Sequence, residues 1–135
     1  AFIQQALKVQ DAMLVCAPII SQKAALGGLS EPLAEIARRR EILDGRRRFL
    51  IERLAEIPRL TWHPTCGAYF AFVGVEDCSD SAQLAMAILD SVHVVTIPGS
   101  AFGRHGEGYL RLSYGSVELP DLDEACRRLS RYFAA

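Results

Sequence analysis

The stretch Gly106-Glu-Gly-Tyr-Leu-Arg-Leu-Ser-Tyr114 carries the clearest structural signal in this chain of 135 residues. Apolar and polar residues alternate along it, which predicts a β-strand over residues 109–114. The alternation places Leu110 and Leu112 on one face of the strand and Arg111 on the other. The segment therefore predicts a sheet with one buried apolar face and one face that carries a single guanidinium.

Strands and helices are predicted on both sides of this segment. Residues 67–73 are rich in aromatic and β-branched residues and predict a strand. A helix is expected from Asp80 or Ser81 to about residue 91, and a short strand over residues 92–97. A last helix begins at Pro120-Asp121, and its inward side is expected to carry Leu122, Ala125, Leu129 and Phe133.

The amino-terminal part of the sequence predicts helices only. A first helix covers residues 2–15, and a second covers residues 19–26 and ends at Gly27-Gly28. Ser30 is expected to be the N-cap of a long third helix, which ends near Ile57 before Pro58. Its apolar face is predicted to carry Leu33, Ile36, Ala37, Leu43, Leu50, Leu54 and Ile57.

This order of elements predicts the fold class. Helices followed by a small sheet with interleaved helices favour a two-layer α/β (α+β) domain. We expect one domain over residues 1–135, with long helices in 1–57 and the sheet and its helices in 64–135. The sheet is expected to be small, three-stranded and mainly antiparallel or mixed.

Charge and composition exclude several classes of function. The formal net charge is −1, which gives no field that would favour nucleic acid or an anionic membrane. Between residues 31 and 56, seven arginines face six acids, so this helix predicts a solvated face with pairs such as Glu35–Arg39 and Asp44–Arg48. No apolar run is long enough to span a bilayer, and no signal peptide is evident, so cytoplasm is the expectation.

The sequence predicts no metal site. Four cysteines are scattered without a Cys-x-x-Cys pair, and His63 and Cys66 form only half of a zinc pattern. Reduced cysteines are expected. The three histidines are isolated, and no nucleophile can be paired with a base.

Arg111 is the leading candidate for a binding residue. A guanidinium in an apolar strand is costly when unpaired, so an acid of the same chain, exposure at a sheet edge or a ligand must satisfy it. Its planar fork matches a carboxylate through two hydrogen bonds. The glycine-rich loop before it, residues 98–108, fits neither the dinucleotide fingerprint nor the P-loop.

Three segments together resemble the fold-type-I aminotransferases, the family of aspartate aminotransferase. They are Pro64-Thr-Cys-Gly-Ala-Tyr-Phe-Ala-Phe72, Val94-Val-Thr-Ile-Pro-Gly-Ser-Ala-Phe-Gly103 and Gly106-Glu-Gly-Tyr-Leu-Arg-Leu-Ser-Tyr114. Their order and spacing are similar to those of the carboxyl-terminal small domain of the family, which the flanking helices also fit.

This resemblance implies a function and its residues. Arg111 matches the arginine that binds the α-carboxylate of the substrate, and Tyr69 matches an aromatic position lining the same site. Members of the family use pyridoxal 5'-phosphate, transfer an amino group between an amino acid and a 2-oxo acid, and generally work as homodimers. A stand-alone α/β module that binds or senses a small carboxylate is the alternative.

The resemblance also implies what this segment lacks. The family's Schiff-base lysine, the acid on the pyridine nitrogen and the phosphate cup belong to a large domain that precedes this region. Lys8 and Lys23, the two lysines of the sequence, do not match that lysine. We therefore expect no catalytic, cofactor-binding or metal-binding residue here, and no activity from the segment alone.

Overall fold

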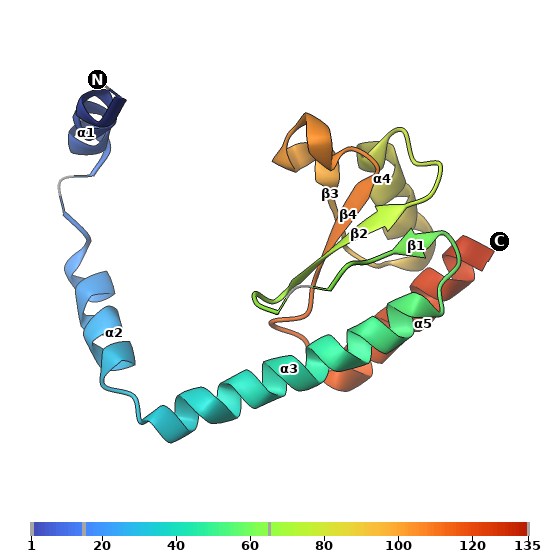
Figure 1. The fold of residues 1–135 in the computed structure, drawn as a ribbon, viewed down its shortest axis with the longest axis horizontal. Helices are drawn as coiled ribbons and strands as arrows, with labels where there is room; N and C mark the ends of the chain where they lie inside the picture. Colours follow the sequence, from blue (N-terminus) through green and yellow to red (C-terminus); the bar gives the residue numbers. More distant parts are fainter. Residues whose placement is uncertain (1, 15, 65, 135) are drawn as a thin grey trace. The chain divides into compact units, whose positions relative to one another are not determined.

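The computed structural model describes residues 2–14, 16–64 and 66–134, and the chain divides into two compact units, residues 1–38 and 39–135. In the first unit, α1 spans Phe2–Met13 and α2 spans Ile19–Leu29 (Figure 1). Neither helix contains a buried residue. Among the described residues, no helix combines the length and the apolarity needed to cross a membrane. The first helix was predicted to reach Val15, which lies outside the described residues.

Two predictions for the helix boundaries in this unit are wrong. The second helix does not stop at Gly27-Gly28 but continues through both glycines to Leu29. Ser30 is the C-cap of α2 and not the N-cap of α3, because its side-chain hydroxyl donates to the carbonyl oxygen of Leu26 at 2.9 Å. A serine can cap either end of a helix, and here its hydroxyl satisfies a carbonyl that the helix end leaves free.

The second unit holds a four-stranded antiparallel sheet, two complete α-helices and, from residue 39 on, most of a third. After α3 (Leu33–Ala55) come β1 (Leu60–Thr61), β2 (Phe70–Val75), α4 (Ser81–Val92), β3 (Ile97–Pro98), β4 (Tyr109–Ser113) and α5 (Leu119–Ala134). Two short 3-10 helices, η1 (Gly99–Phe102) and η2 (Arg104–Gly106), connect β3 to β4. The strand order is β1-β2-β4-β3, so β2 and β4 form the centre of the sheet (Figure 1).

The predicted fold class is confirmed, with one strand more than expected. The fourth strand, β1, is only two residues long and has no pattern that a sequence could show. The predicted strand over 92–97 is mostly wrong. Val92 ends α4, His93 takes a left-handed conformation (φ 56°) that caps this helix, and pairing with β4 begins only at Ile97. Val94 and Thr96 of this segment are buried without pairing in the sheet, whereas Val95 is exposed.

All three helices of this unit contribute to a core on one face of the sheet. Ala71, Val73, Leu110 and Leu112 are buried there, as the alternation in β4 predicts. The helices add Leu50 and Leu54 from α3, Ala85 and Ile88 from α4, and Leu122, Cys126, Leu129 and Phe133 from α5. Figure 1 shows α5 running beside the second half of α3. The opposite face of the sheet holds Arg111.

The charged run of α3 is not wholly solvated, which corrects the sequence-based prediction. Arg46 is only 8% exposed, since it shares a helix face with Leu50 and Leu54. Its guanidinium donates to the carbonyl oxygen of Gly115 and to Glu118 Oε1, both at 2.9 Å. The predicted pair Asp44–Arg48 is present at 3.2 Å. Leu33 and Ile36, predicted on the apolar face, are exposed.

A candidate carboxylate site on the open face of the sheet

Arg111 occupies the centre of the sheet face that lies away from the core. In the register of the sheet it is opposite Phe72 of β2 on one side and Ile97 of β3 on the other. Directly paired residues of antiparallel strands project from the same face. The neighbours Leu110 and Leu112 point into the core and fix β4 in this register. The strand therefore holds Arg111 on a rigid element rather than on a loop.

The guanidinium of Arg111 contacts two aromatic rings. Its Cζ lies 4.4 Å from the ring centroid of Phe70 and 4.9 Å from that of Phe102. Both distances are within the range of cation–π attraction. Within the described residues, the side chain of Arg111 forms no ion pair and no hydrogen bond, and its Nε is buried without a hydrogen-bond partner. Since the guanidinium makes no hydrogen bond to these residues, its terminal nitrogens Nη1 and Nη2 remain able to donate to a ligand or to water.

The loop that carries Phe102 is held by a close approach of two glycines. A Cβ on Gly99 would lie 1.9 Å from the carbonyl oxygen of Gly106, and a Cβ on Gly106 would lie 2.1 Å from that of Gly99. Any side chain at either position would overlap backbone. The glycines of residues 98–108 therefore allow the compact turn formed by η1 and η2. They do not form a phosphate-binding loop.

Polar contacts tie the same loop to the first turn of α4. The Ser81 hydroxyl donates to Ser100 Oγ at 3.0 Å, and the Ser100 backbone N–H donates to Ser81 Oγ at 3.2 Å. Glu107 Oε1 accepts the backbone N–H of Ser81 at 2.6 Å and that of Gly108 at 3.1 Å. These hydrogen bonds to the ionised form hold the pKa of Glu107 below its ordinary value. They also fix the loop that presents Phe102.

More aromatic rings continue this surface. The rings of Phe72 and Tyr109 stack with centroids 4.9 Å apart and planes 4° from parallel, and Phe102 meets Phe72 edge-on at 6.0 Å. Phe72, Phe102 and Tyr109 are each more than a third exposed. No helix of the second unit, within the described residues, contributes a core residue on this face. The face therefore presents one cation within an accessible aromatic surface.

Tyr69, the second predicted site residue, does not contact Arg111. Its ring lies 4.4 Å from the ring of Phe70, centroid to centroid, and packs over Gly115, where a Cβ would be 2.8 Å from the ring. Tyr69 is half exposed and also lines a hollow with Asp44 and Arg47 of α3. Phe70 is thus the common neighbour of the two predicted site residues, and it separates them.

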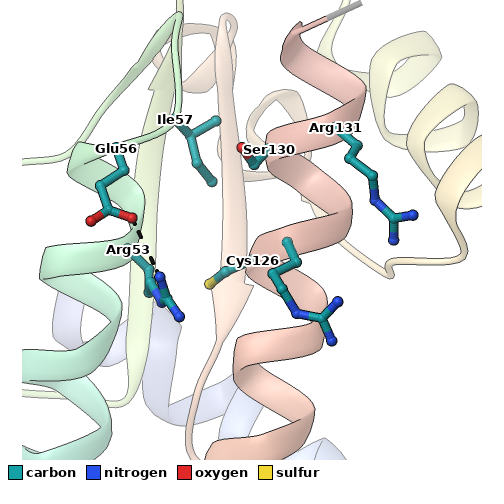
Figure 2. Close-up of a pocket in the computed structure, with 7 residues that line it drawn as sticks. Arg53, Glu56, Ile57, Cys126, Ser130 and Arg131 are labelled. Carbon is teal, nitrogen blue, oxygen red and sulfur yellow. Dashed lines mark hydrogen bonds and ion pairs between the residues drawn. The ribbon is translucent and has the colours of Figure 1, made fainter.

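A second hollow lies between the end of α3 and α5. Figure 2 shows Arg53 near the end of α3, with Glu56 and Ile57 of the turn that follows, facing Cys126, Ser130 and Arg131 on α5. The groove between them has a volume of about 350 Å³. The best-placed cation in it, Arg53, is already paired with Asp123 at 2.5 Å and with Glu56 at 3.4 Å. Since the pair with Asp123 joins α3 to α5, the groove belongs to a structural contact between these helices.

The remaining polar candidates do not converge. His63, His93 and His105 are all exposed, and Cys16 and Cys66 are exposed as well. Among the described residues, no group of three or more His, Cys, Asp or Glu side chains is arranged to hold a metal ion. Of the residues that the structure describes, Arg111 is the one charged residue with a buried side-chain nitrogen that has no hydrogen-bond partner.

Comparison with known proteins identifies the family. The sequence model of the family "Aminotransferase class I and II" matches residues 1–129. The chain belongs to this family. Its similarity to the fold-type-I aminotransferases, predicted from three segments, is thereby confirmed. The chain spans about a third of the length of the curated relatives that it matches.

Individual aminotransferases support the same assignment. The arginine–pyruvate transaminase AruH of Pseudomonas aeruginosa is 37% identical over 119 residues, which are 87% of this chain and 30% of that protein. The aspartate aminotransferase of Pyrococcus abyssi is 31% identical over 132 residues, which are 96% of this chain and 33% of that protein. The alanine aminotransferase structure from Pyrococcus furiosus superimposes with a TM-score of 0.83 at 25% identity, covering 98% of this chain and 34% of that one.

The family implies pyridoxal phosphate, but the described residues of this aminotransferase segment do not fit that cofactor. A lysine that forms a Schiff base is activated in a desolvated pocket. Lys8 and Lys23 instead lie on α1 and α2, two helices without a buried residue. No step of the reaction can therefore be assigned to a cofactor held by the residues described.

The sequence-based reasoning missed the two rings that contact Arg111. Phe70 precedes Phe72 by two residues, so alternation alone places both on one face of β2. That this is the face of Arg111 depends on the register between β2 and β4, which neither strand reveals alone. Phe102 was noted as part of a turn motif, and its contact with Arg111 follows from the folding of η1.

Proposed function

We propose that this chain supplies the substrate-carboxylate site of a longer, pyridoxal-phosphate-dependent aminotransferase, with Arg111 as the residue that binds the carboxylate. One observation carries the proposal. On an open sheet face, a guanidinium fixed by a strand and two aromatic rings has no acidic partner among the described residues. An anion from outside these residues would accept hydrogen bonds from its terminal nitrogens.

The chemistry of the substrates suits this arrangement. An amino acid and a 2-oxo acid each carry a carboxylate on the carbon that exchanges the amino group. One arginine can therefore bind the substrates of both half-reactions in the same orientation. The amino-group transfer itself belongs to the cofactor, which we expect the large domain of the full protein to hold. The task of Arg111 is to bind and orient.

Tyr69 has a secondary place in the proposal. Its ring contacts Phe70, which in turn contacts Arg111, and half of its surface is accessible. We infer that it borders the substrate site instead of touching the carboxylate. A Tyr69→Leu variant should change the affinity for substrates less than a substitution of Arg111 does.

Substitution of Arg111 in the full-length protein tests the proposal. Lysine keeps the charge but loses the bidentate fork, so Arg111→Lys should raise KM for both the amino acid and the 2-oxo acid by about 10- to 100-fold. Arg104→Lys is the matched control, because Arg104 is exposed on the neighbouring turn and bonds only to His105. A KM in Arg111→Lys equal to that of the control would contradict the proposal.

Titrations of the isolated chain separate the proposal from its alternative, a stand-alone module that binds a small carboxylate. In calorimetric titrations with amino acids or 2-oxo acids we expect no measurable heat of binding. In a spectral titration with pyridoxal phosphate we expect no stable absorption band of an aldimine. Saturable binding of an amino acid would favour the module. We also expect the full protein to be a cytoplasmic homodimer, which gel filtration and cell fractionation would test.

A further inference from the structure

The two rings around Arg111 come from separate parts of the chain. Phe70 is the first residue of β2, whereas Phe102 is the last residue of η1. Phe102 is 53% exposed, so its ring lies at the surface of the molecule. The loop is in turn fixed by the close approach of Gly99 and Gly106 and by the hydrogen bonds of Ser81. This construction directs an exposed ring onto the guanidinium.

We propose that Phe70 and Phe102 form an aromatic clamp that holds the Arg111 guanidinium in one plane and leaves its terminal Nη edge free for the substrate carboxylate. The inference rests on the proposed function of Arg111. It makes Phe70 and Phe102 positioning residues, since they act through the arginine and make no hydrogen bond themselves.

The burial of one guanidinium nitrogen indicates which nitrogens of Arg111 face the ligand. Of the three guanidinium nitrogens, Nε is the one buried without a hydrogen-bond partner. A carboxylate therefore cannot approach from the side that would use Nε, and it meets Nη1 and Nη2 end-on. Two hydrogen bonds in parallel require a fixed plane, and ring contacts at 4.4 and 4.9 Å supply that constraint without competing for the donors.

The clamp also explains why the arginine is held before any ligand arrives. A long side chain that is free to rotate loses conformational entropy when it binds, and this loss weakens affinity. Contacts that order the side chain in advance reduce the loss. A ring replaced by an aliphatic group would keep the apolar surface but lose the attraction of the π-face for the cation.

Exchange of the Arg111 Nε–H proton with water gives a readout that needs no activity. In the chain of 135 residues, NMR should show slower exchange at Arg111 than at Arg48, whose side chain is 68% exposed. Phe102→Leu should accelerate exchange at Arg111 by about tenfold or more, because removing the ring opens access to Nε. Tyr109→Leu is the matched control: it removes another exposed ring from the same face, one without contact to the guanidinium, and should leave the rate unchanged.

Kinetics of the full-length protein give the second readout. Phe102→Leu should raise KM for amino acid and 2-oxo acid by about 3- to 10-fold while kcat changes by less than about twofold, since only binding is affected. Phe102→Tyr keeps the ring and should restore both constants. Arg104→Lys, the control used above, should leave both constants as they are in the unmodified protein. A purely structural role for Phe102 would instead lower kcat and expression together, without rescue by tyrosine.

The outcomes separate this inference from the proposed function. If Arg111→Lys raises KM while Phe102→Leu changes neither KM nor the exchange rate, the clamp is wrong and the carboxylate site stands. If Arg111→Lys leaves KM unchanged, the carboxylate site is wrong, and with it the inference that depends on it. If Tyr109→Leu accelerates exchange as much as Phe102→Leu does, the protection is a general property of the face, and the clamp is also wrong.

Discussion

Arg46 on α3 donates a hydrogen bond of 2.9 Å to the carbonyl oxygen of Gly115, which lies 69 residues further along the chain. The same guanidinium bonds Glu118 at the turn before α5. One buried side chain therefore connects the long helix to the segment that follows β4. Because β4 carries Arg111, this connection fixes the end of the strand on which the candidate site depends.

Loss of Arg46 should destabilise the second unit. Arg46→Met keeps much of the apolar stem but leaves the Gly115 carbonyl without its partner, so we expect a loss of about 1–3 kcal/mol in the free energy of unfolding. Arg48→Met is the control, since Arg48 is exposed and its ion pair with Asp44 should contribute less than about 1 kcal/mol. Urea unfolding measures the free energy of unfolding of both variants. Equal losses of this free energy would contradict the stabilising role of the Arg46 hydrogen bonds.

The two glycines of the η1–η2 turn should not tolerate a methyl group. Gly99→Ala places a Cβ against the backbone of Gly106, and we expect it to lower stability by at least about 1–3 kcal/mol and to displace Phe102. Gly45→Ala provides the contrast, because its Cβ would meet nothing within 4 Å inside α3. That variant should gain about 0.5–1 kcal/mol from helix propensity. Thermal unfolding of the two proteins should therefore shift in opposite directions.

Stability should depend on the ionisation of Glu107. The pKa of this carboxyl is held below its ordinary value by the backbone N–H of Ser81, so folding is favoured when the group is ionised. The contribution is present above the unfolded pKa of about 4.3 and is lost as the pH falls through the lower native pKa. Glu107→Gln should therefore lower the urea midpoint at neutral pH, and the difference from the unmodified chain should narrow in acid.

The pH dependence of this difference tests whether the charge of Glu107 is what stabilises the fold. A constant difference between the unmodified chain and Glu107→Gln from neutral to acid pH would show that the hydrogen bond, and not the charge, matters.

The cysteines should differ widely in reactivity. Cys126 is 4% exposed, and burial raises the pKa of its thiol to about 11. Compared with an ordinary thiol, this lowers the thiolate fraction at neutral pH by about a hundredfold. A thiol reagent should therefore label the exposed Cys16 and Cys66 in the folded chain, and Cys126 only after denaturant is added. Rapid labelling of Cys126 without denaturant would show that the contact between α3 and α5 opens readily.

The sequence predicts those parts of the fold that depend on local periodicity. The alternation around Arg111 correctly predicts β4 and its buried face, and the spacing of Leu122, Leu129 and Phe133 correctly predicts the inward side of α5. Both patterns repeat over several residues of one element. Ser30 shows the limit, because a single capping residue can serve the helix before it or the helix after it.

Contacts between distant segments are what the sequence does not reveal. Arg46 looks like one more member of an arginine run, and its burial follows from the packing of α3 against the end of β4. Phe102 is separated from Arg111 by a turn whose path depends on two glycines meeting. The resemblance to a family pointed to Arg111, but only the folded chain shows which rings surround it.

The shortness of the two outer strands has a consequence for solubility. β1 and β3 contain two residues each, and one of those in β3 is Pro98, which has no N–H to offer. The outer strands therefore offer few free backbone groups with which a strand of a neighbouring chain could pair. Such pairing at the edge of a sheet is a common first step of aggregation. The rim of the sheet thus protects the protein from self-association through its backbone, even though one face of that sheet carries exposed aromatic rings.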